Sequence, residues 1–459
     1  MKQLINNFDV TKIAIFFIFF LKTKIISNDF ITLRTNKKND PMRKIQDDNK
    51  LYSFLRPYVD YHVRKSFRRY KVVGYDKIPQ NAACIFGANH TNTLMDALAL
   101  LCMNHEKKVF IARGDIFKKP AIAKIMFFLR ILPIYRIRDG FKSVKDNNAE
   151  IIDKAADVVR DEVKLFLYPE AAHRTKHSLR QLSKGIFHIA LKANNDFGHE
   201  KPVYLVPTGI EYGDYFRYRS TVLINFGEPI NVTEYVNNHK DENEAVILNN
   251  LREMFTERLS RQISYIPDNE EDYEAIWEMT KTKSGLKGSL EERLENNQKT
   301  IKEILEWKEK EPEKAKEKFE KVNKFIKKRK KKGISVTSVT KKNIFGTVLW
   351  KTLVAILGLP YYIVAAIANL PIWLVTKILK NSFKDKAWGN TVSFGVEFVL
   401  HPILTAICII LTFCFLPWEI AILSSLLFYP SYMYFVDFSE FLRRWISDVK
   451  WMFNKKLKF

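Results

Sequence analysis

AACIFGANHTNTLMD, residues 82–96, is the stretch that decides the fold of this chain. Residues 82–86 are apolar and end at Gly87, which predicts a short buried strand, and the polar cluster after them predicts a strand-to-helix turn. A histidine and a carboxylate in such a turn can meet at the mouth of a sheet. An imidazole that a carboxylate orients can take a proton from a hydroxyl. Alone, the pair His90 and Asp96 is weak support for catalysis, because these residue types often co-occur by chance.

Three further segments follow in the chain: LPIYRIR at 132–138, LFLYPE at 165–170 and LVPTGI at 205–210. This succession resembles the ordered blocks of the glycerolphosphate acyltransferase family, which are a His-Asp block, an Arg block, a Pro-Glu-Gly block and a Val-Pro block. The resemblance covers about residues 70–230. The ordered set is far more specific than any one block.

Two departures from the family pattern affect the expected site. Five residues separate His90 from Asp96, where the family usually has four. At ~100° per helical residue the extra residue turns a carboxylate to another face, so we expect the turn to absorb it before the helix begins. The third block has Ala171 and His173 where the family tends to have Gly and Arg. Nearby side chains that can supply the positive charge instead are Arg174, Arg180 and Lys184.

The chemistry of each residue suggests its role. His90 is the expected general base, and Asp96 is expected to fix its tautomer; the alternatives are a capping or core histidine and an acid favoured in the first turn of a helix. The resemblance implies that Arg136 grips the phosphate of the acceptor, since a guanidinium matches phosphate bidentately, with Arg138 as a weaker companion. It also implies that Glu170 binds substrate.

The function expected from the resemblance is a membrane-bound O-acyltransferase that uses neither metal nor cofactor. It would move an acyl group from acyl-CoA or acyl-carrier protein to 1-acylglycerol 3-phosphate or glycerol 3-phosphate. Transfer is expected to be direct, without a covalent acyl-enzyme. The alternatives are an acyltransferase for a lysophospholipid or an aminoacyl lipid, and a membrane scaffold that kept the fold and lost the chemistry.

Charge and cysteine content restrict the partners. The 459-residue chain has a formal net charge of +24, which requires a polyanionic neighbour such as nucleic acid or an anionic membrane leaflet. Its C-terminal quarter is strongly apolar and no zinc-finger or RNA-recognition pattern occurs, so we expect a membrane surface and no nucleic acid. The cysteines lack paired metal-ligand spacing and are expected to be reduced packing residues: Cys84, Cys102, Cys408 and Cys414.

Alternating strand-like and helical runs predict an α/β fold with a mixed, mainly parallel sheet flanked by helices. The expected strands are 70–73, 82–86, 109–112, 165–168, 203–207 and 221–226. The expected helices are 94–103, 121–129, 149–159, 182–193 and 244–263. His90 and Glu170 both follow their strands at the carboxyl end, where reactive groups gather in such sheets.

The composition changes along the chain predict five parts. These are an N-terminal extension of uncertain status (1–41), an interfacial amphipathic helix broken near Pro57 (42–70), the acyltransferase domain (71–267), a charged helical arm with a basic linker (268–343) and a C-terminal α-helical membrane region (344–459). For the helix at 42–70, an ordinary surface helix is nearly as well supported. Pro312 is expected to divide the arm into two helices.

The C-terminal region contains apolar stretches at 352–376, 402–418 and 420–436. The first is long enough to cross a bilayer core of ~30 Å but carries prolines, and the other two are expected to form a helical hairpin. Basic residues flank all three stretches. Keeping them on the cytoplasmic side predicts a re-entrant first stretch, a hairpin that crosses twice and a catalytic domain on the cytoplasmic face. A model with three spans is the alternative.

Overall fold

The computed structural model describes residues 44–135, 144–198, 201–284 and 288–454. It divides into two compact units, which we describe separately. The first consists of the described residues up to Ile263 together with Leu379–Gly395, and the second of Ser264–Ile378 and the described part of Val396–Phe459.

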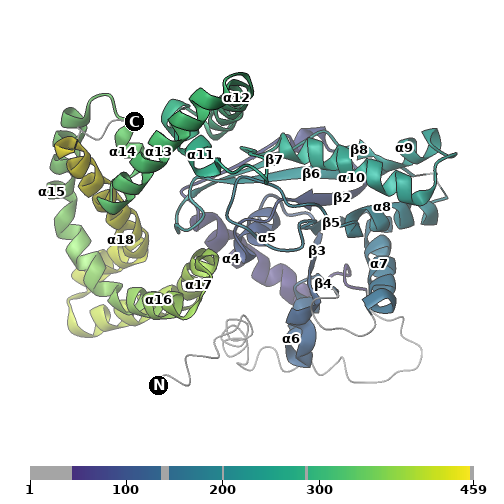
Figure 1. Cartoon of the computed structure of the whole chain (residues 1–459). Helices are drawn as coiled ribbons and strands as arrows, with labels where there is room; N and C mark the ends of the chain where they lie inside the picture. The colour runs from purple at the N-terminus through teal and green to yellow at the C-terminus, as the bar shows by residue number, and fades with distance from the viewer. Residues whose placement is uncertain (1–43, 136–143, 199–200, 285–287, 455–459) are drawn as a thin grey trace. The chain divides into compact units, whose positions relative to one another are not determined.

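The first unit is built on one eight-stranded sheet of the described residues, in the order β1-β7-β6-β2-β5-β3-β4 with β8 beside β6 (Figure 1). Strands β2 to β6 run parallel, whereas β7 and β8 are antiparallel to β6 and β1 is parallel to β7. The strands are β1 (Arg69–Val73), β2 (Ala83–Ala88), β3 (Lys108–Arg113), β4 (Ile131–Ile134), β5 (Lys164–Leu167), β6 (Val203–Tyr212), β7 (Thr221–Phe226) and β8 (Ile230–Asn231).

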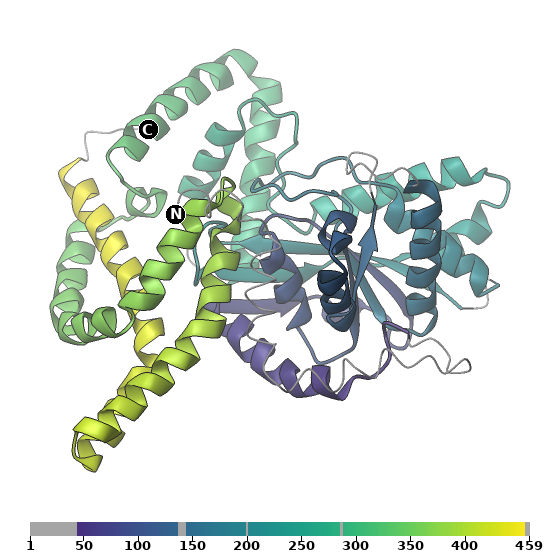
Figure 2. The same cartoon turned by 90° about the horizontal axis from the view of Figure 1, so that it is seen from below.

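Helices cover the sheet on both faces. The crossovers through α5 and α6 lead across the sheet in one direction and those through α7 and α8 in the other, so right-handed connections place the two pairs on opposite faces. Helix α10 packs against α8 and β6, and α4 packs against α5 (Figure 2). The helices are α4 (Lys50–Lys65), α5 (Leu94–Leu101), α6 (Pro120–Phe128), α7 (Val144–Arg160), α8 (Gly185–Asp196), α9 (Val232–Asn238) and α10 (Glu244–Ser260).

The expected α/β fold with a mixed, mainly parallel sheet is confirmed. The strands β4 and β8 and the helix α9 were not predicted. Strand β4 has only four residues and contains Pro133, which lacks a ladder donor and is tolerated because β4 lies at the edge of the sheet. Strand β6 extends beyond the expected end at 207 to Tyr212, which brings that side chain into the site described below.

Helix α4 does not break at Pro57, so that prediction is wrong. The Nε atom of Arg56 donates to Asp60 Oδ1 at 2.7 Å, and this pair holds the helical turn that contains the proline. Arg56 also donates to the carbonyl of Leu101 at the end of α5, which attaches α4 to the unit. The exposed aromatic side chains of α4 are Phe54, Tyr58 and Tyr61.

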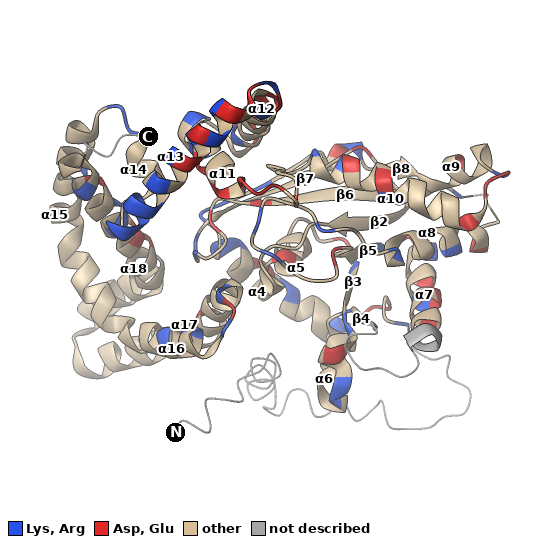
Figure 3. Ribbon diagram, viewed as in Figure 1, with Lys and Arg blue, Asp and Glu red and all other residues tan. Residues whose placement is uncertain are grey.

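The second unit begins with α11 (Tyr273–Lys283), α12 (Leu290–Lys310), α13 (Pro312–Lys331) and α14 (Val336–Val339). Helices α12 and α13 are divided at Pro312 as expected. Their apolar faces are buried against α11, where Ile276, Ile301 and Phe319 share one cluster, so the arm is a packed bundle and not a free hairpin. Lysine and arginine gather at the end of α13 (Figure 3).

The apolar region forms α15 (Ile344–Ala368), α16 (Leu370–Ser382), α17 (Gly389–Phe415) and α18 (Trp418–Phe453). Among the described residues, three helices are long and apolar enough to cross a membrane: Ile344–Ala368, Lys386–Phe415 and Trp418–Phe453. Within the second unit α15 packs along α18, where Tyr434 donates to the carbonyl of Gly358 at 2.8 Å. Helix α17 begins and α18 ends well outside the expected limits of the hairpin, whereas the turn between them lies close to its expected place.

Candidate active site

His90 and Asp96 meet just beyond the carboxyl end of β2. The distance from His90 Nδ1 to Asp96 Oδ2 is 2.8 Å. The carboxylate is fully buried, whereas the imidazole keeps 19% of its side-chain surface exposed. A carboxylate on Nδ1 selects the tautomer that leaves Nε2 as a proton acceptor. The arrangement therefore suits a general base that substrate can reach.

The loop that joins them, residues 89–96, is called here the His–Asp loop. Its extra residue is taken up before α5, as expected, because α5 begins at Leu94 and Asp96 lies in its first turn. The backbone bends sharply at Thr93, which has a φ of 49°, an unusual value for a β-branched residue. Asp96 Oδ2 also accepts hydrogen bonds from the backbone N–H groups of Thr91 at 2.9 Å and Asn92 at 2.8 Å. One carboxylate thus fixes both the loop and the imidazole.

Two tyrosines complete the surroundings of this pair. Tyr212, on β6, donates to Asp96 Oδ1 at 2.8 Å. Burial and the Asp96 charge raise the pKa of Tyr212 well above its usual range, so it stays protonated as a donor. The ring of Tyr168 stacks on the imidazole of His90, with centroids 4.3 Å apart. Its hydroxyl is buried and has no hydrogen-bond partner among the described residues.

Glu170 connects the two loops that follow β2 and β5. Its carboxylate accepts from the backbone N–H of His90 at 2.9 Å and from that of Arg180 at 3.0 Å. Burial raises the pKa of Glu170, against the opposing effect of these two N–H donors. In this structure the side chain supports the loop that carries His90. The proximity follows from the parallel pairing of β2 with β5, in which Gly87 is opposite Leu167.

The basic residues expected to bind substrate do not share one environment in the structure. Arg136 and Arg138 lie outside the described residues, which end in this part at Tyr135. Arg174 donates its backbone N–H to the carbonyl of His90 at 2.9 Å, and Arg180 binds Glu170 through its backbone. Lys184 is the N-cap residue of α8. No described contact brings the three cationic groups into one ring.

Two features near His90 had no counterpart in the sequence analysis. His173, which stands where the family tends to have Arg, lies with its ring centroid 5.7 Å from that of His90. Its Nε2 lies 2.7 Å from Asp385 Oδ2, more than 200 residues further along the chain. Thr391, also from this distant segment, contacts Thr93 of the His–Asp loop. No residue spacing could indicate these contacts.

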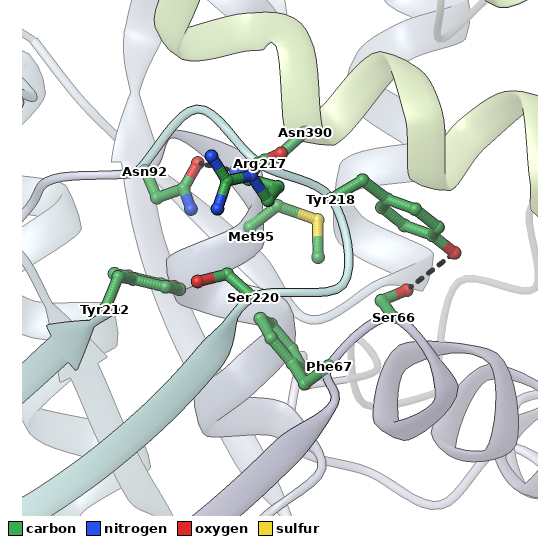
Figure 4. A pocket seen from close by; sticks show the side chains of 9 residues that line it. All are labelled: Ser66, Phe67, Asn92, Met95, Tyr212, Arg217, Tyr218, Ser220 and Asn390. Atoms are coloured by element: carbon green, nitrogen blue, oxygen red, sulfur yellow. Dashed lines mark hydrogen bonds between the residues drawn. The ribbon is translucent and has the colours of Figure 1, made fainter. Parts of the chain in front are cut away.

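A small, partly open hollow lies beside the His–Asp loop (Figure 4). Asn92 and Met95 of the loop border it, together with Tyr212 of β6. Arg217 and Asn390 lie on another side of the pocket, with the guanidinium and the amide close to Asn92 (Figure 4). The space beside the loop is therefore incompletely filled by side chains.

Part of the chain is similar to known acyltransferases. Residues 69–211 match the family model described as Acyltransferase. This range contains all four sequence blocks, and the match confirms the acyltransferase domain and the enzyme class that the blocks predict. Among solved structures, the chain is similar to the 1-acyl-sn-glycerophosphate (LPA) acyltransferase PlsC from Thermotoga maritima. That similarity has 18% sequence identity and a TM-score of 0.31, and it covers 46% of this chain and 82% of that chain.

Proposed function

From the acyltransferase domain that the chain carries at residues 69–211, we propose that it is a membrane-bound O-acyltransferase of glycerophospholipid synthesis. The donor is a fatty acyl thioester, acyl-CoA or acyl-carrier protein, and the acceptor is a hydroxyl of 1-acylglycerol 3-phosphate or glycerol 3-phosphate. One observation carries this proposal. It is the 2.8 Å contact between His90 Nδ1 and Asp96 Oδ2, which leaves Nε2 available at the carboxyl edge of the sheet.

The proposed reaction is a direct attack by the acceptor. The hydroxyl oxygen forms a bond to the thioester carbon while His90 Nε2 takes the hydroxyl proton. Collapse of the tetrahedral intermediate breaks the carbon–sulfur bond, and the proton passes from the imidazolium to the leaving thiolate. Asp96 stabilises the imidazolium in between and is itself held by Tyr212.

The position of β4 supports the proposed role of Arg136. Tyr135 is fixed at the end of β4 because Asn148 donates to its carbonyl at 2.8 Å and accepts from its N–H at 2.9 Å. Arg136 follows directly. Strand β4 lies three strands from β2, about 14 Å at the usual strand spacing. Glycerol phosphate is shorter than this distance, so the proposal requires the long arginine side chain to reach toward the phosphate of an acceptor whose hydroxyl is at His90.

Charge and hydropathy support a reaction at a membrane. Three described helices are long and apolar enough to span a bilayer. The last turn of α13 carries the exposed Lys328, Lys330 and Lys331 ahead of them, whereas Arg329 is buried and paired with Glu278. Exposed basic residues near an anionic leaflet contribute about 1 kcal/mol each to binding. The acylated product, and 1-acylglycerol 3-phosphate as acceptor, are components of such a surface.

The test is an assay of the purified full chain in anionic lipid vesicles, with each donor paired with each acceptor. We expect transfer to one of the glycerol phosphates, and loss of transfer in His90→Ala. The matched control is His105→Ala, which removes an imidazole whose side chain is 83% exposed. Transfer only to lysophospholipids or aminoacyl lipids would reassign the acceptor. The proposal would be overturned if the protein consumed no acyl thioester with any glycerolipid acceptor, or if His90→Ala kept full activity.

A further inference from the structure

The segment Leu379–Gly395 is surrounded in sequence by the apolar helices, but it packs in the same compact unit as the sheet. It comprises the end of α16, a short helix at Lys386–Trp388 and the first turns of α17. Inside this unit it contacts both loops that carry the proposed active-site residues. It therefore belongs structurally to the catalytic unit.

The first turn of α17 contacts the His–Asp loop through buried polar groups. Thr391 Oγ1 lies 2.8 Å from Thr93 Oγ1, and the two residues are 1% and 4% exposed. Asn390 donates to the carbonyl of Tyr215 at 2.6 Å and lies 3.4 Å from Asn92 Oδ1. Removing one member of a buried hydrogen-bonded pair leaves the other without water or partner. These contacts are consequently strong determinants of loop position.

The His–Asp loop requires such support. The positive φ of Thr93 is a sparsely populated conformation that persists only where surrounding contacts enforce it. Thr93 lies between His90 and Asp96, so a shift of Thr93 changes the distance between the two.

A second contact of the same segment acts on the loop after β5. Asp385 Oδ2 lies 2.7 Å from His173 Nε2, and the ring of Trp388 lies 6.3 Å from the ring of His173. His173 in turn packs edge-on against the imidazole of His90. The segment thus contacts the active centre from both the His–Asp loop and the chain after Glu170.

We propose that Thr391 and Asn390 are positioning residues of the acyl transfer, which hold the His–Asp loop in the conformation that joins His90 to Asp96. The C-terminal helices then complete the active centre in addition to anchoring it. This inference rests on the proposed function for its kinetic measurement. It goes beyond that function because it assigns a catalytic requirement to a segment outside residues 69–211.

The experiment is a double-mutant cycle on the full chain, with Thr391→Val, Thr93→Val and the double variant. Thr391→Val removes the hydroxyl at nearly constant volume, and we expect kcat to fall about tenfold with KM for both substrates within about twofold, because the loop is misplaced after substrate has bound. Thr93→Val is expected to cause the same loss. The double variant is expected to lose no more than either single variant, since both remove one contact.

Thr391→Ser keeps the hydroxyl and is expected to retain wild-type kcat. The matched control is Thr412→Val on the same helix. The hydroxyl of Thr412 donates only to the carbonyl of Ile409 in the described structure, so this variant should leave kcat unchanged. Additive losses in the cycle, or wild-type kcat in Thr391→Val and in Asn390→Ala/Thr391→Val, would refute the inference.

A second measurement separates this inference from the proposed function. The rate at which diethyl pyrocarbonate modifies His90, followed by peptide mass spectrometry, reports the surroundings of the imidazole without any substrate. We expect Thr391→Val and Thr93→Val to raise this rate severalfold and Thr391→Ser to leave it unchanged. If the wild type turns over no acyl thioester, the proposed function fails while this rate still decides the positioning role. Equal rates in all variants would refute the role even in an active enzyme.

Discussion

At the residue scale, the histidine and the carboxylate could be predicted from the sequence, but their partners could not. His90 and Asp96 have five residues between them in one loop, so local geometry brings them together once the turn takes up the extra residue. Tyr212 reaches Asp96 only because β6 pairs with β2, which is a tertiary contact. Glu170 was expected to bind substrate, and its two backbone contacts are visible only in the structure.

Replacing Tyr212 with phenylalanine tests the contribution of the hydroxyl that binds Asp96. A hydrogen bond to a charged group contributes about 1.5–3 kcal/mol, and Asp96 keeps its other three donors, so we expect kcat to fall about tenfold. Steady-state kinetics of Tyr212→Phe measures this. Tyr204→Phe, on the same strand, is the matched control and should remain at wild-type kcat. Unchanged kcat in Tyr212→Phe would show that the carboxylate needs no fourth partner.

For Tyr168, in contrast to Tyr212, we expect removal of the hydroxyl to stabilise the protein without lowering kcat. Its hydroxyl is buried without a hydrogen-bond partner among the described residues, although its ring stacks on His90. Such a group loses its water without compensation, so Tyr168→Phe should raise the free energy of unfolding by about 1–2 kcal/mol. Thermal unfolding of the two proteins in the same lipid measures the difference. Stabilisation with retained kcat is the expected pair of results, and a lower kcat would mean that the hydroxyl contacts substrate.

At the scale of elements, the strands around the site follow from sequence pattern, whereas the support of the loops does not. Strands β2, β5 and β7 are apolar runs bounded by turn residues, and their limits agree with expectation to within about two residues. Strand β4 escaped prediction because Pro133 is atypical of a strand. The role of the first turn of α17 could not be predicted, because the buried contacts of Thr391 with Thr93 and of Asn390 with Tyr215 leave no periodic pattern in the sequence.

Strand β3 begins with a buried lysine that should make stability depend on pH. Burial lowers the pKa of Lys108 to about 7, whereas an unfolded lysine has a pKa of about 10.4. Between these values the unfolded chain binds a proton that the folded chain lacks. The free energy of unfolding therefore rises with pH by up to about 1.4 kcal/mol per pH unit from this residue. Below pH 7 both states are protonated and the slope vanishes.

Urea unfolding of the wild type and of Lys108→Met at several pH values between about 7 and 10 isolates this contribution. The wild-type curve is expected to be the steeper one, because only it contains the titrating lysine. Lys107→Met is the matched control, since that side chain is 44% exposed and pairs with Asp48. Equal slopes for the wild type and Lys108→Met would contradict the expectation.

At the scale of the whole molecule, the packing of Leu379–Gly395 in the catalytic unit restricts how the chain can cross a membrane. Leu379–Gly395 packs with residues that precede Ile263, so both must lie on one side of the bilayer. The intervening chain contains a single helix long and apolar enough to span, Ile344–Ala368. One crossing would place the two parts on opposite sides. We therefore expect the stretch formed by α15 and α16 to enter the membrane and return, as the distribution of basic residues also predicts.

The remaining helices then form a hairpin that crosses twice. Residues 396–415 of α17 belong to the second unit. At 1.5 Å per residue they extend about 30 Å, which is enough to span the hydrocarbon core. Helix α18 returns from Trp418. The loop between them, near Glu419, should lie on the side opposite His90.

Single cysteines introduced at Lys384 and at Glu419 test this topology in sealed vesicles. A membrane-impermeant maleimide should label Lys384→Cys only from the side on which His90 is modified by an impermeant reagent, and Glu419→Cys only from the other side. Cys408 is partly exposed and Cys414 is exposed, so both are replaced by serine in the two variants and in their parent, which serves as the unlabelled control. Labelling of both positions from the same side would exclude the hairpin. Labelling of Lys384→Cys from the side opposite His90 would separate Leu379–Gly395 from the catalytic unit and remove the basis for a positioning role of Thr391.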